Sequence, residues 1–470
     1  MKKFILILSA ILVLSCTFSV VPAFSADSDF VIEDGVLLSY NGKDTTVTIP
    51  SSVNVIADKV FSGNTAIKTV ALHSNLYSIG NEAFKDCTSL EKVSGADNVN
   101  YVGALAFANT KFLTKSTDEF CTLGSVLISY NGKSQKVILP DSVKTISAYA
   151  FLRNKTIASF VSGSNLCSIG EGAFYECTAL SELEVSENLT FVGADAFKST
   201  KWLSSQSDYV TIGDGLLIAY KGTSTVVNIP LSVKSISPNA FYANKKITSV
   251  NLSSSVYSIG SRAFMDCSNL SQVNFNNGLV MIDDEAFAKC VKLNKITTGS
   301  NLSLIGEGAF MNCAGLESVS LCGNNLNIGY GAFAYCTSLN TVMMSKDIAS
   351  VTECAFAKDS SLEYVTIPPQ IISVNKNSFD GCDKLTVVCE ADSFAYNALS
   401  DSFSVSHKIG DADTDGSVTV IDATAVQMHL ANKKTLSQKG FAHSDVDYDG
   451  TVSVLDATNI QQIIAGLIKK

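Results

Sequence analysis

The sequence has few of the side chains that most often carry acid–base catalysis or form flat stacking surfaces. Its 470 residues include four histidines and one tryptophan, Trp202. Histidine is the commonest general acid or base, and His73 alone precedes His407 in the chain. The composition therefore disfavours an enzyme that depends on imidazole and a binding surface built from several indole rings.

Positive charge and long apolar runs are also in short supply. The formal net charge is −10, which disfavours a nucleic-acid partner and is compatible with bound cations. Beyond the N-terminal leader no apolar stretch approaches about 18 residues, so the sequence predicts no transmembrane segment. With 46% hydrophobic and 17% charged residues, the chain is not disordered as a whole, and its length predicts more than one domain.

The N-terminus has the pattern of a secretory signal. Lys2 and Lys3 precede an apolar run at residues 4–14, and small residues follow at 20–26, where a peptidase can cut. We therefore expect residues 1–25 to be a signal peptide and the mature protein to be extracellular.

The body of the chain repeats with a fixed period. Phenylalanine recurs in steps of 23 residues, with two steps of 44 residues. The positions are Phe61, Phe84, Phe107, Phe151, Phe174, Phe197, Phe241, Phe264, Phe287, Phe310, Phe333, Phe356 and Phe379. A period of this length is typical of a solenoid, in which each repeat forms one coil.

Three further segments recur at offsets of 90 residues around Tyr40, Tyr130 and Tyr220. Asn-Gly between two apolar runs is a strong signal for a hairpin turn, and it occurs at 41–42 and at 131–132. We therefore expect three hairpin insertions, with turns at these positions.

Within each unit the apolar residues keep a Leu-x-x-Leu-x-Leu spacing. Leu270, Val273 and Phe275 follow it, and their alternation marks a short parallel strand. One coil cannot bury these residues, whereas stacked coils can. The sequence thus predicts a leucine-rich repeat solenoid of about 13 coils, counted by the phenylalanines.

The repeated unit, Ile-Gly-x-x-Ala-Phe-x-x-Cys-x-x-Leu-x-x-Val, resembles the bacterial leucine-rich repeats of the BspA type over roughly residues 30 to 405. The resemblance implies an exported adhesion or interaction protein without a catalytic centre. We expect the solenoid to span residues 26–389, and residues 390–407 to form its C-terminal cap and the joint to the next module.

Thirteen cysteines in an exported chain raise the question of disulfides. Seven of them follow the repeat phenylalanine by three residues, namely Cys87, Cys177, Cys267, Cys290, Cys313, Cys336 and Cys382. Other coils have Asn64, Asn154, Asn244, Thr110 or Thr200 at this position. Interchange with Asn and Thr indicates a buried polar ladder that bonds the turn backbone. A disulfide between stacked neighbours such as Cys267 and Cys290 is the alternative, because one strand step falls within bridging range.

The C-terminal residues contain two twelve-residue acidic loops, 34 residues apart. Asp at positions 1, 3 and 5, Gly at 6, a backbone carbonyl at 7 and an acid at 12 are typical of a calcium loop. The predicted ligands are Asp411, Asp413, Asp415, Ser417 and Asp422 in the first loop, and Asp445, Asp447, Asp449, Thr451 and Asp456 in the second. We expect two Ca²⁺ ions, which order the loops and fold the module.

Two loop–helix units with no helix before the first loop resemble a type I dockerin over about 60 residues. The resemblance implies a cohesin module of a scaffoldin as the partner. The residues carried over as cohesin contacts are Val420, Ile421, Gln427 and Met428 in the first half, and Val454, Leu455, Gln461 and Gln462 in the second. Core packing is the alternative for Val420 and Val454. Because the halves nearly superpose, binding in two orientations is a hypothesis.

The complete prediction is an α+β chain, with a leucine-rich repeat solenoid followed by a small all-α dockerin at residues 408–470. The residues expected to point outward from the solenoid strands are short and polar, such as Glu182, Asn251, Ser320 and Thr366. The favoured function is a secreted, non-catalytic cellulosome component whose repeats bind a protein or cell-surface target. The alternative is a dockerin-borne enzyme or carbohydrate-binding module acting in polysaccharide catabolism.

Overall fold

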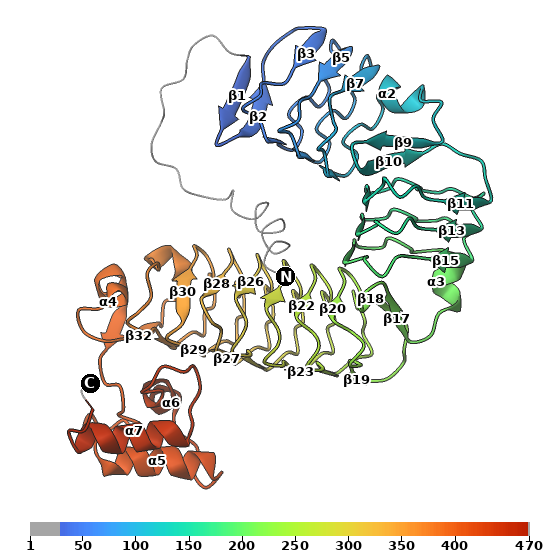
Figure 1. The fold of residues 1–470 in the computed structure, drawn as a ribbon. Helices are drawn as coiled ribbons and strands as arrows, with labels where there is room; N and C mark the ends of the chain where they lie inside the picture. Colours follow the sequence, from blue (N-terminus) through green and yellow to red (C-terminus); the bar gives the residue numbers. More distant parts are fainter. Residues whose placement is uncertain (1–28, 469–470) are drawn as a thin grey trace.

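A computed structural model of the chain describes residues 29–468, so the predicted signal peptide lies outside the described residues. The repeats form a curved solenoid, and a small helical module packs beneath its C-terminal end (Figure 1). The predicted leucine-rich repeat solenoid with short parallel strands is confirmed, as is the helical C-terminal module.

Each coil contributes two short strands, one to each side of the curve. Strands of two residues, such as β22 (Ser258–Ile259), form the inner sheet on the concave side, and strands of three, such as β23 (Gln272–Asn274), form the outer sheet (Figure 1). In β22 Ile259 points into the core, and in β23 Val273 does so. The alternation of the sequence thus fixes which side chains are buried.

The chain divides into three blocks, each with its own apolar core. Block 1 comprises β1 (Phe30–Glu33), β2 (Val36–Tyr40), β3 (Thr46–Thr48), β4 (Val55–Ile56), β5 (Thr69–Ala71), β6 (Ser78–Ile79), β7 (Lys92–Ser94), β8 (Tyr101–Val102) and α2 (Lys111–Thr114). Block 2 comprises β9 (Phe120–Leu123), β10 (Val126–Tyr130), β11 (Lys136–Ile138), β12 (Thr145–Ile146), β13 (Ser159–Val161), β14 (Ser168–Ile169), β15 (Glu182–Glu184), β16 (Phe191–Val192) and α3 (Lys201–Ser205).

Block 3 is the longest. Its inner sheet contains β17 (Tyr209–Ile212), β18 (Leu216–Tyr220), β20 (Ser235–Ile236), β22, β24 (Met281–Ile282), β26 (Leu304–Ile305), β28 (Leu326–Ile328) and β30 (Ile348–Val351). Its outer strands are β19 (Val226–Asn228), β21 (Ser249–Asn251), β23, β25 (Lys295–Thr297), β27 (Ser318–Leu321), β29 (Thr341–Met344), β31 (Tyr364–Thr366), β32 (Thr386–Val388) and β33 (Ser404–Ser406). A 3-10 turn, η1 (Lys376–Phe379), and α4 (Phe394–Leu399) close the array.

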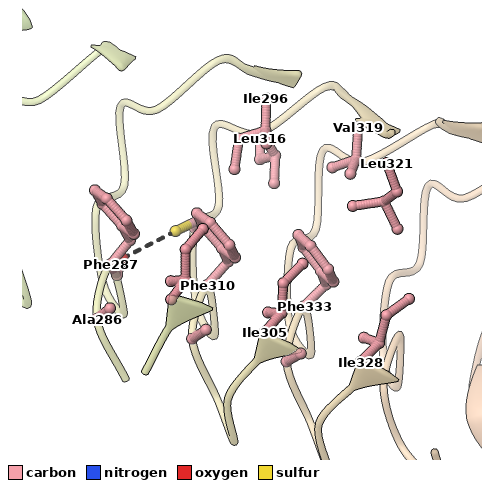
Figure 2. Packing of buried hydrophobic residues seen from close by; sticks show 14 of the residues in the cluster. Ala286, Phe287, Ile296, Ile305, Phe310, Leu316, Val319, Leu321, Ile328 and Phe333 are labelled. Carbon is pink, nitrogen blue, oxygen red and sulfur yellow. Dashed lines mark hydrogen bonds between the residues drawn. The ribbon is translucent and has the colours of Figure 1, made fainter. Parts of the chain in front are cut away.

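Columns of stacked aromatic rings run through the three cores, and their ends define the blocks. In block 3 the rings of Phe287, Phe310 and Phe333 lie 5.1 Å apart and within 4° of parallel (Figure 2). The first two columns end where Phe107 meets Phe112 and Phe197 meets Trp202, beside α2 and α3. A new hairpin then begins the next column, so the chain turns a corner at each block boundary.

Three hairpins are present, but their predicted turn position is wrong. Strand β1 pairs antiparallel with β2 through a turn at Asp34-Gly35, and β9 pairs in the same way with β10. Asn41-Gly42 follows the hairpin, and the N–H of Asn41 donates to the carbonyl of Asp29 at 2.8 Å. Gly42 is needed because a Cβ there would lie 2.2 Å from the hydroxyl of Tyr40.

The hairpins are part of the coils. The ring of Tyr40 lies 5.2 Å from that of Phe61, and Tyr130 and Tyr220 likewise continue the ring columns of their blocks. Each hairpin segment is therefore a further coil, and the array exceeds the thirteen coils that the phenylalanines count.

The repeat cysteines form the predicted polar ladder. The thiol of Cys313 donates to the carbonyl of Phe287 at 3.2 Å, the dashed line that ends at Phe287 in Figure 2. Each of the other six repeat cysteines likewise donates to the carbonyl of the repeat phenylalanine in the coil before its own. The hydroxyls of Thr110 and Thr200 donate to the phenylalanine carbonyl of their own coil, and the side chain of Asn64 accepts from an N–H group of its turn. All twelve cysteines of the described residues are free thiols.

One coil places an acid in this ladder. Asp359 is fully buried, and its Oδ1 accepts from the N–H of Cys336 at 2.7 Å, while its Oδ2 has no partner among the described residues. Burial raises the pKa of Asp359 to about 9, against the opposing effect of that hydrogen bond. An acid of this kind is protonated in the folded protein at neutral pH.

Asp359→Asn is expected to stabilise the solenoid at neutral and alkaline pH. The unfolded chain ionises this acid above pH of about 4, so its contribution to stability is present below that pH and is lost as pH rises toward 9. Replacement removes this loss, and we expect a gain that grows by at most about 1.4 kcal/mol for each pH unit above about 4, with little change at pH 4. Chemical denaturation of the full chain at several pH values measures it. The exposed Glu353→Gln is the control, and equal pH slopes for the wild type and Asp359→Asn would contradict the prediction.

Candidate functional site

The two acidic loops adopt closely similar backbones. Gly416 and Gly450 at position 6 have φ of +94° and +85°, a region that favours glycine. The preceding Thr414 and Tyr448 also have positive φ. These sharp turns bring the side chains of positions 1, 3 and 5 toward one point in each loop.

The structure brings together three carboxylates per loop. Ligand atoms of Asp411, Asp413 and Asp415 all lie within 4.8 Å of one another, and so do those of Asp445, Asp447 and Asp449. Such clusters of hard oxygen atoms suit Ca²⁺.

Burial and charge within the loops favour a cation. The buried Oδ1 of Asp411 has no hydrogen-bond partner in the described part of the chain, which is costly unless a cation binds it. Burial, followed by the charges of Asp456, Asp449 and Asp447, raises the pKa of Asp445 to about 8. A divalent ion would compensate this repulsion, so the residues present fit calcium.

The acids at position 12 have a second role that the sequence analysis missed. Asp422 Oδ1 accepts from the N–H of Asp413 at 2.9 Å, and its Oδ2 accepts from that of Thr419 at 2.7 Å. Asp456 does the same with Val446 and Ser453. Each acid therefore ties its loop to a capping box, which a Thr/Ser-x-x-Asp pattern at 419 and 453 could have revealed.

The capping boxes begin helices α5 (Val420–Leu430) and α7 (Val454–Ile464), which pack side by side. The predicted position-7 residues, Ser417 and Thr451, lie just before them and donate their N–H groups to Asp415 and Asp449. In the sequence, the shorter helix α6 (Gln438–Ser444) lies between these two helices.

The residues predicted to contact a partner lie largely on the surface of α5 and α7. Val420 is 61% exposed and Val454 is 65% exposed, so the alternative of core packing for these two is wrong. Ile421, Met428 and Leu455 are exposed as well. Gln427 and Gln461 are exposed, and Gln462 is half-buried. Exposed apolar residues gathered on two helices are typical of a protein-binding face.

The helical module is docked onto the outer sheet of block 3. Helix α6 packs on β29 and β31, and α5 and α7 lie beyond it (Figure 1). Thr366 Oγ1 donates to the carbonyl of Ala442 at 2.8 Å, and Ser406 Oγ lies 3.0 Å from His443 Nε2. Ser320 and Thr366, which were expected to point outward from their strands, are both buried, and Thr366 is buried against the helical module.

The two loops differ sharply in their surroundings. Tyr448 of the second loop is buried against Val388 and Tyr364, and its carbonyl accepts from the N–H of Lys346 at 2.6 Å. Burial, then the charges of Asp449 and Asp445, raises the pKa of Cys322 to about 12. In the first loop Asp415, Gly416 and Ser417 are exposed. Tyr448 replaces Thr414 at the equivalent position, a difference that could have suggested this contact.

Within the described residues no helix is long and apolar enough to cross a membrane. A family model of the BspA type leucine rich repeat region matches residues 39–126, 122–214, 210–340 and 304–432. A model of the dockerin type I domain matches residues 409–465.

Similar solved structures include bacterial leucine-rich repeat proteins. A T. pallidum leucine-rich repeat protein is 26% identical, with 42% of this chain and 94% of that chain covered and a TM-score of 0.35. A leucine-rich repeat protein from Bacteroides ovatus is 20% identical, with 82% and 99% covered and a TM-score of 0.31. No curated protein matches the chain.

Proposed function

Because this chain belongs to the family of BspA-type leucine-rich repeat proteins and ends in a type I dockerin domain, we propose that it is a secreted, non-catalytic component of a cellulosome-type complex. The dockerin binds a cohesin of a scaffoldin in a calcium-dependent way. The repeats bind a protein or cell-surface target.

The observation that carries this proposal is the exposed apolar face of α5 and α7. Helix α6 and the second loop are covered by the solenoid, while Val420, Ile421, Val454 and Leu455 remain exposed. Removing these side chains from water would stabilise a complex. Because the two pairs occupy equivalent positions in the two halves, a cohesin can bind in either of two orientations.

Calcium enters this proposal through ten residues. Asp411, Asp413, Asp415 and Asp422 would hold one ion with the carbonyl of Ser417, and Asp445, Asp447, Asp449 and Asp456 would hold the other with that of Thr451. The ions supply charge compensation that orders the loops and so fixes the direction of α5 and α7.

Binding of the full chain to a panel of immobilised cohesins tests the proposal. We expect retention in calcium and its loss with a chelator. Val420→Asp with Ile421→Asp should weaken binding only about twofold, because one of two equivalent orientations is lost. The same changes at Val454 and Leu455 should act alike, and all four together should abolish retention.

Thr435→Asp is the control, since this exposed residue lies between α5 and α6. Absence of calcium-dependent retention on every cohesin would contradict the proposal. Retention of the fourfold variant at the wild-type level would show that α5 and α7 do not form the contact face. Complete loss of retention after substitution of Val420 and Ile421 alone would mean that the cohesin binds in a single orientation, and binding in two orientations would be ruled out.

A further inference from the structure

A hollow of about 340 Å³ lies on the inner side of the curve, where the three blocks meet. Beyond its hairpin, block 2 contributes only the two-residue strands β12, β14 and β16 to the inner sheet, and residues of blocks 1 and 3 line the same hollow on either side of them. Six lining residues bear aromatic or strongly polar side chains: Asn81, Tyr101, Glu171, Phe191, Asn239 and Arg262. They come from all three blocks, and the hollow exists only because the solenoid turns at its block boundaries.

Two aromatic rings stand out on this surface. The first residue of a two-residue inner strand points away from the core, and in half of these strands it is Ser or Thr, as in Thr145, Ser168 and Ser235. Tyr101 and Phe191 occupy this position in the last inner strands of blocks 1 and 2, each 38% exposed. Their neighbours Val102 and Val192 fill the core. Neither ring belongs to the apolar core, and each keeps more than a third of its surface exposed beside the hollow.

The two rings are placed on either side of a floor of small hydroxyl residues. Thr145 Oγ1 donates to the carbonyl of Asn100 at 3.3 Å, which places β12 beside Tyr101. Thr145 is in register with Ser168 and Ser168 with Phe191. Phe191 is therefore two strand steps, about 10 Å, from Thr145. This spacing leaves room for a flat ligand to contact both rings.

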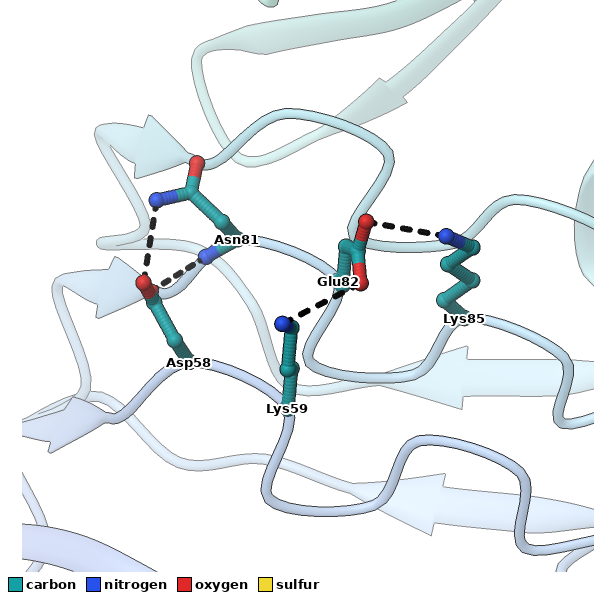
Figure 3. A network of polar contacts seen from close by, with 5 residues as sticks. All are labelled: Asp58, Lys59, Asn81, Glu82 and Lys85. Carbon is teal, nitrogen blue, oxygen red and sulfur yellow. Dashed lines mark hydrogen bonds and ion pairs between the residues drawn. The ribbon is translucent and has the colours of Figure 1, made fainter.

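Hydrogen-bond donors and acceptors surround the rings of Tyr101 and Phe191. Asn81 is fixed by Asp58, whose carboxylate accepts its N–H at 2.6 Å and its Nδ2 at 3.2 Å (Figure 3). The Oδ1 of Asn239 is buried without a hydrogen-bond partner among the described residues. Glu171 accepts from the hydroxyl of Tyr149, and Arg262 pairs with Glu285 through Nε. The Oδ1 of Asn81 already accepts from the N–H of Ala104 at 2.8 Å, so Asn81 offers only a donor at Nδ2. Asn239 and Glu171 offer acceptors and Arg262 offers donors, with no large excess of one charge.

We propose that this hollow binds the chain of a neutral polysaccharide, with Tyr101 and Phe191 packing on the apolar faces of sugar rings and Asn81, Glu171, Asn239 and Arg262 bonding the hydroxyl groups. Aromatic faces beside mixed donors and acceptors match a ligand that is apolar on its ring faces and rich in hydroxyls at its rim. The cavity volume falls in the range of small-ligand sites. An extended peptide fits less well, because the floor strand β14 is already paired on both sides and has no free edge to extend.

This inference rests on the proposed role of the repeats as the target-binding module, and it names the class of target. It also limits the expectation that the residues pointing outward from the solenoid strands are short and polar. That expectation concerned the outer strands, whereas the aromatic residues lie on the inner sheet.

Isothermal titration of the calcium-loaded full chain with cellohexaose, xylohexaose, mannohexaose and laminarihexaose tests the inference. We expect at least one of these to bind, and Tyr101→Ala with Phe191→Ala to weaken that binding at least about tenfold. Both residues are exposed, so thermal unfolding should change little. Glu171→Gln should weaken binding less, because the amide keeps one acceptor.

Tyr257→Ala is the matched control. Tyr257 is 46% exposed and stands next to β22, but it does not line the hollow. Absence of binding to all four oligosaccharides, unchanged binding by the double variant, or equal loss in Tyr257→Ala would each overturn the inference. Cohesin retention is measured on the same samples. Failure of sugar binding with intact cohesin retention would overturn this inference alone, whereas loss of cohesin retention would count against the proposed anchoring function.

Discussion

Phe310→Ala is expected to destabilise the solenoid by about 3–5 kcal/mol, the range for removing a fully buried aromatic ring. Phe310 has no exposed surface and lies between the parallel rings of Phe287 and Phe333, 5.1 Å from each. The substitution leaves a cavity in the middle of the longest ring column. Neighbouring coils cannot close it without disturbing their own hydrogen bonds, such as that from the Cys336 thiol to the Phe310 carbonyl.

The stability of a solenoid depends on contacts between adjacent coils, so this cavity weakens two interfaces at once. We expect a lower denaturation midpoint and an additional transition as block 3 separates into two parts. Chemical denaturation followed by far-ultraviolet circular dichroism measures both effects. Phe310→Leu should have an intermediate effect.

Tyr335→Ala is the control for Phe310→Ala. Tyr335 lies in the next coil but is half exposed, and its loss should cost at most about 1 kcal/mol. Similar midpoints for the two variants would mean that the ring columns do not carry the stability assigned to them.

Gly450→Ala is expected to separate the dockerin from the outer sheet, whereas Gly416→Ala is not. Both glycines occupy position 6 of a calcium loop with positive φ, so both substitutions carry the same local strain of about 1 kcal/mol. A Cβ on Gly450 would also lie 2.7 Å from the carbonyl oxygen of Leu321 and 3.2 Å from Sγ of Cys322. A Cβ on Gly416 would meet nothing within 4 Å.

Two measurements distinguish these variants. Small-angle scattering should show a larger maximum dimension for Gly450→Ala than for the wild type or Gly416→Ala. Alkylation of Cys322, followed by peptide mapping, should be at least about tenfold faster in Gly450→Ala, because the second loop no longer covers this thiol.

Identical scattering and identical Cys322 reactivity in the two glycine variants would contradict the docked arrangement. Cohesin retention should persist in both at saturating calcium, because Val420, Ile421, Val454 and Leu455 are exposed even in the docked module. Its loss in Gly450→Ala alone would mean that docking positions the cohesin-binding face.

Local patterns in the sequence predicted the elements whose neighbours are set by the repeat itself. The 23-residue step of phenylalanine fixes the stacking partner of each coil, so the ring column and the cysteine ladder follow from it. The loops at 411–422 and 445–456 are equally local, because four of their acids and one glycine lie within twelve residues. The hairpin turns were misplaced because Asn-Gly was interpreted as the two central residues of a hairpin turn. Here Gly42 instead makes room for the ring of Tyr40.

The sequence by itself thus determined the solenoid, its thiol ladder and two acidic loops that fit calcium. Only the tertiary structure decided that the array turns at two corners, that Tyr448 and Gly450 lie against the outer sheet, and that Tyr101 and Phe191 face one hollow. The physical reason is that these features depend on which surfaces meet across long sequence separations. Of two loops with nearly the same sequence, the second is covered at its tip by the outer sheet and the first is exposed at Asp415, Gly416 and Ser417. The packing of separate blocks, and not the local pattern, sets this difference.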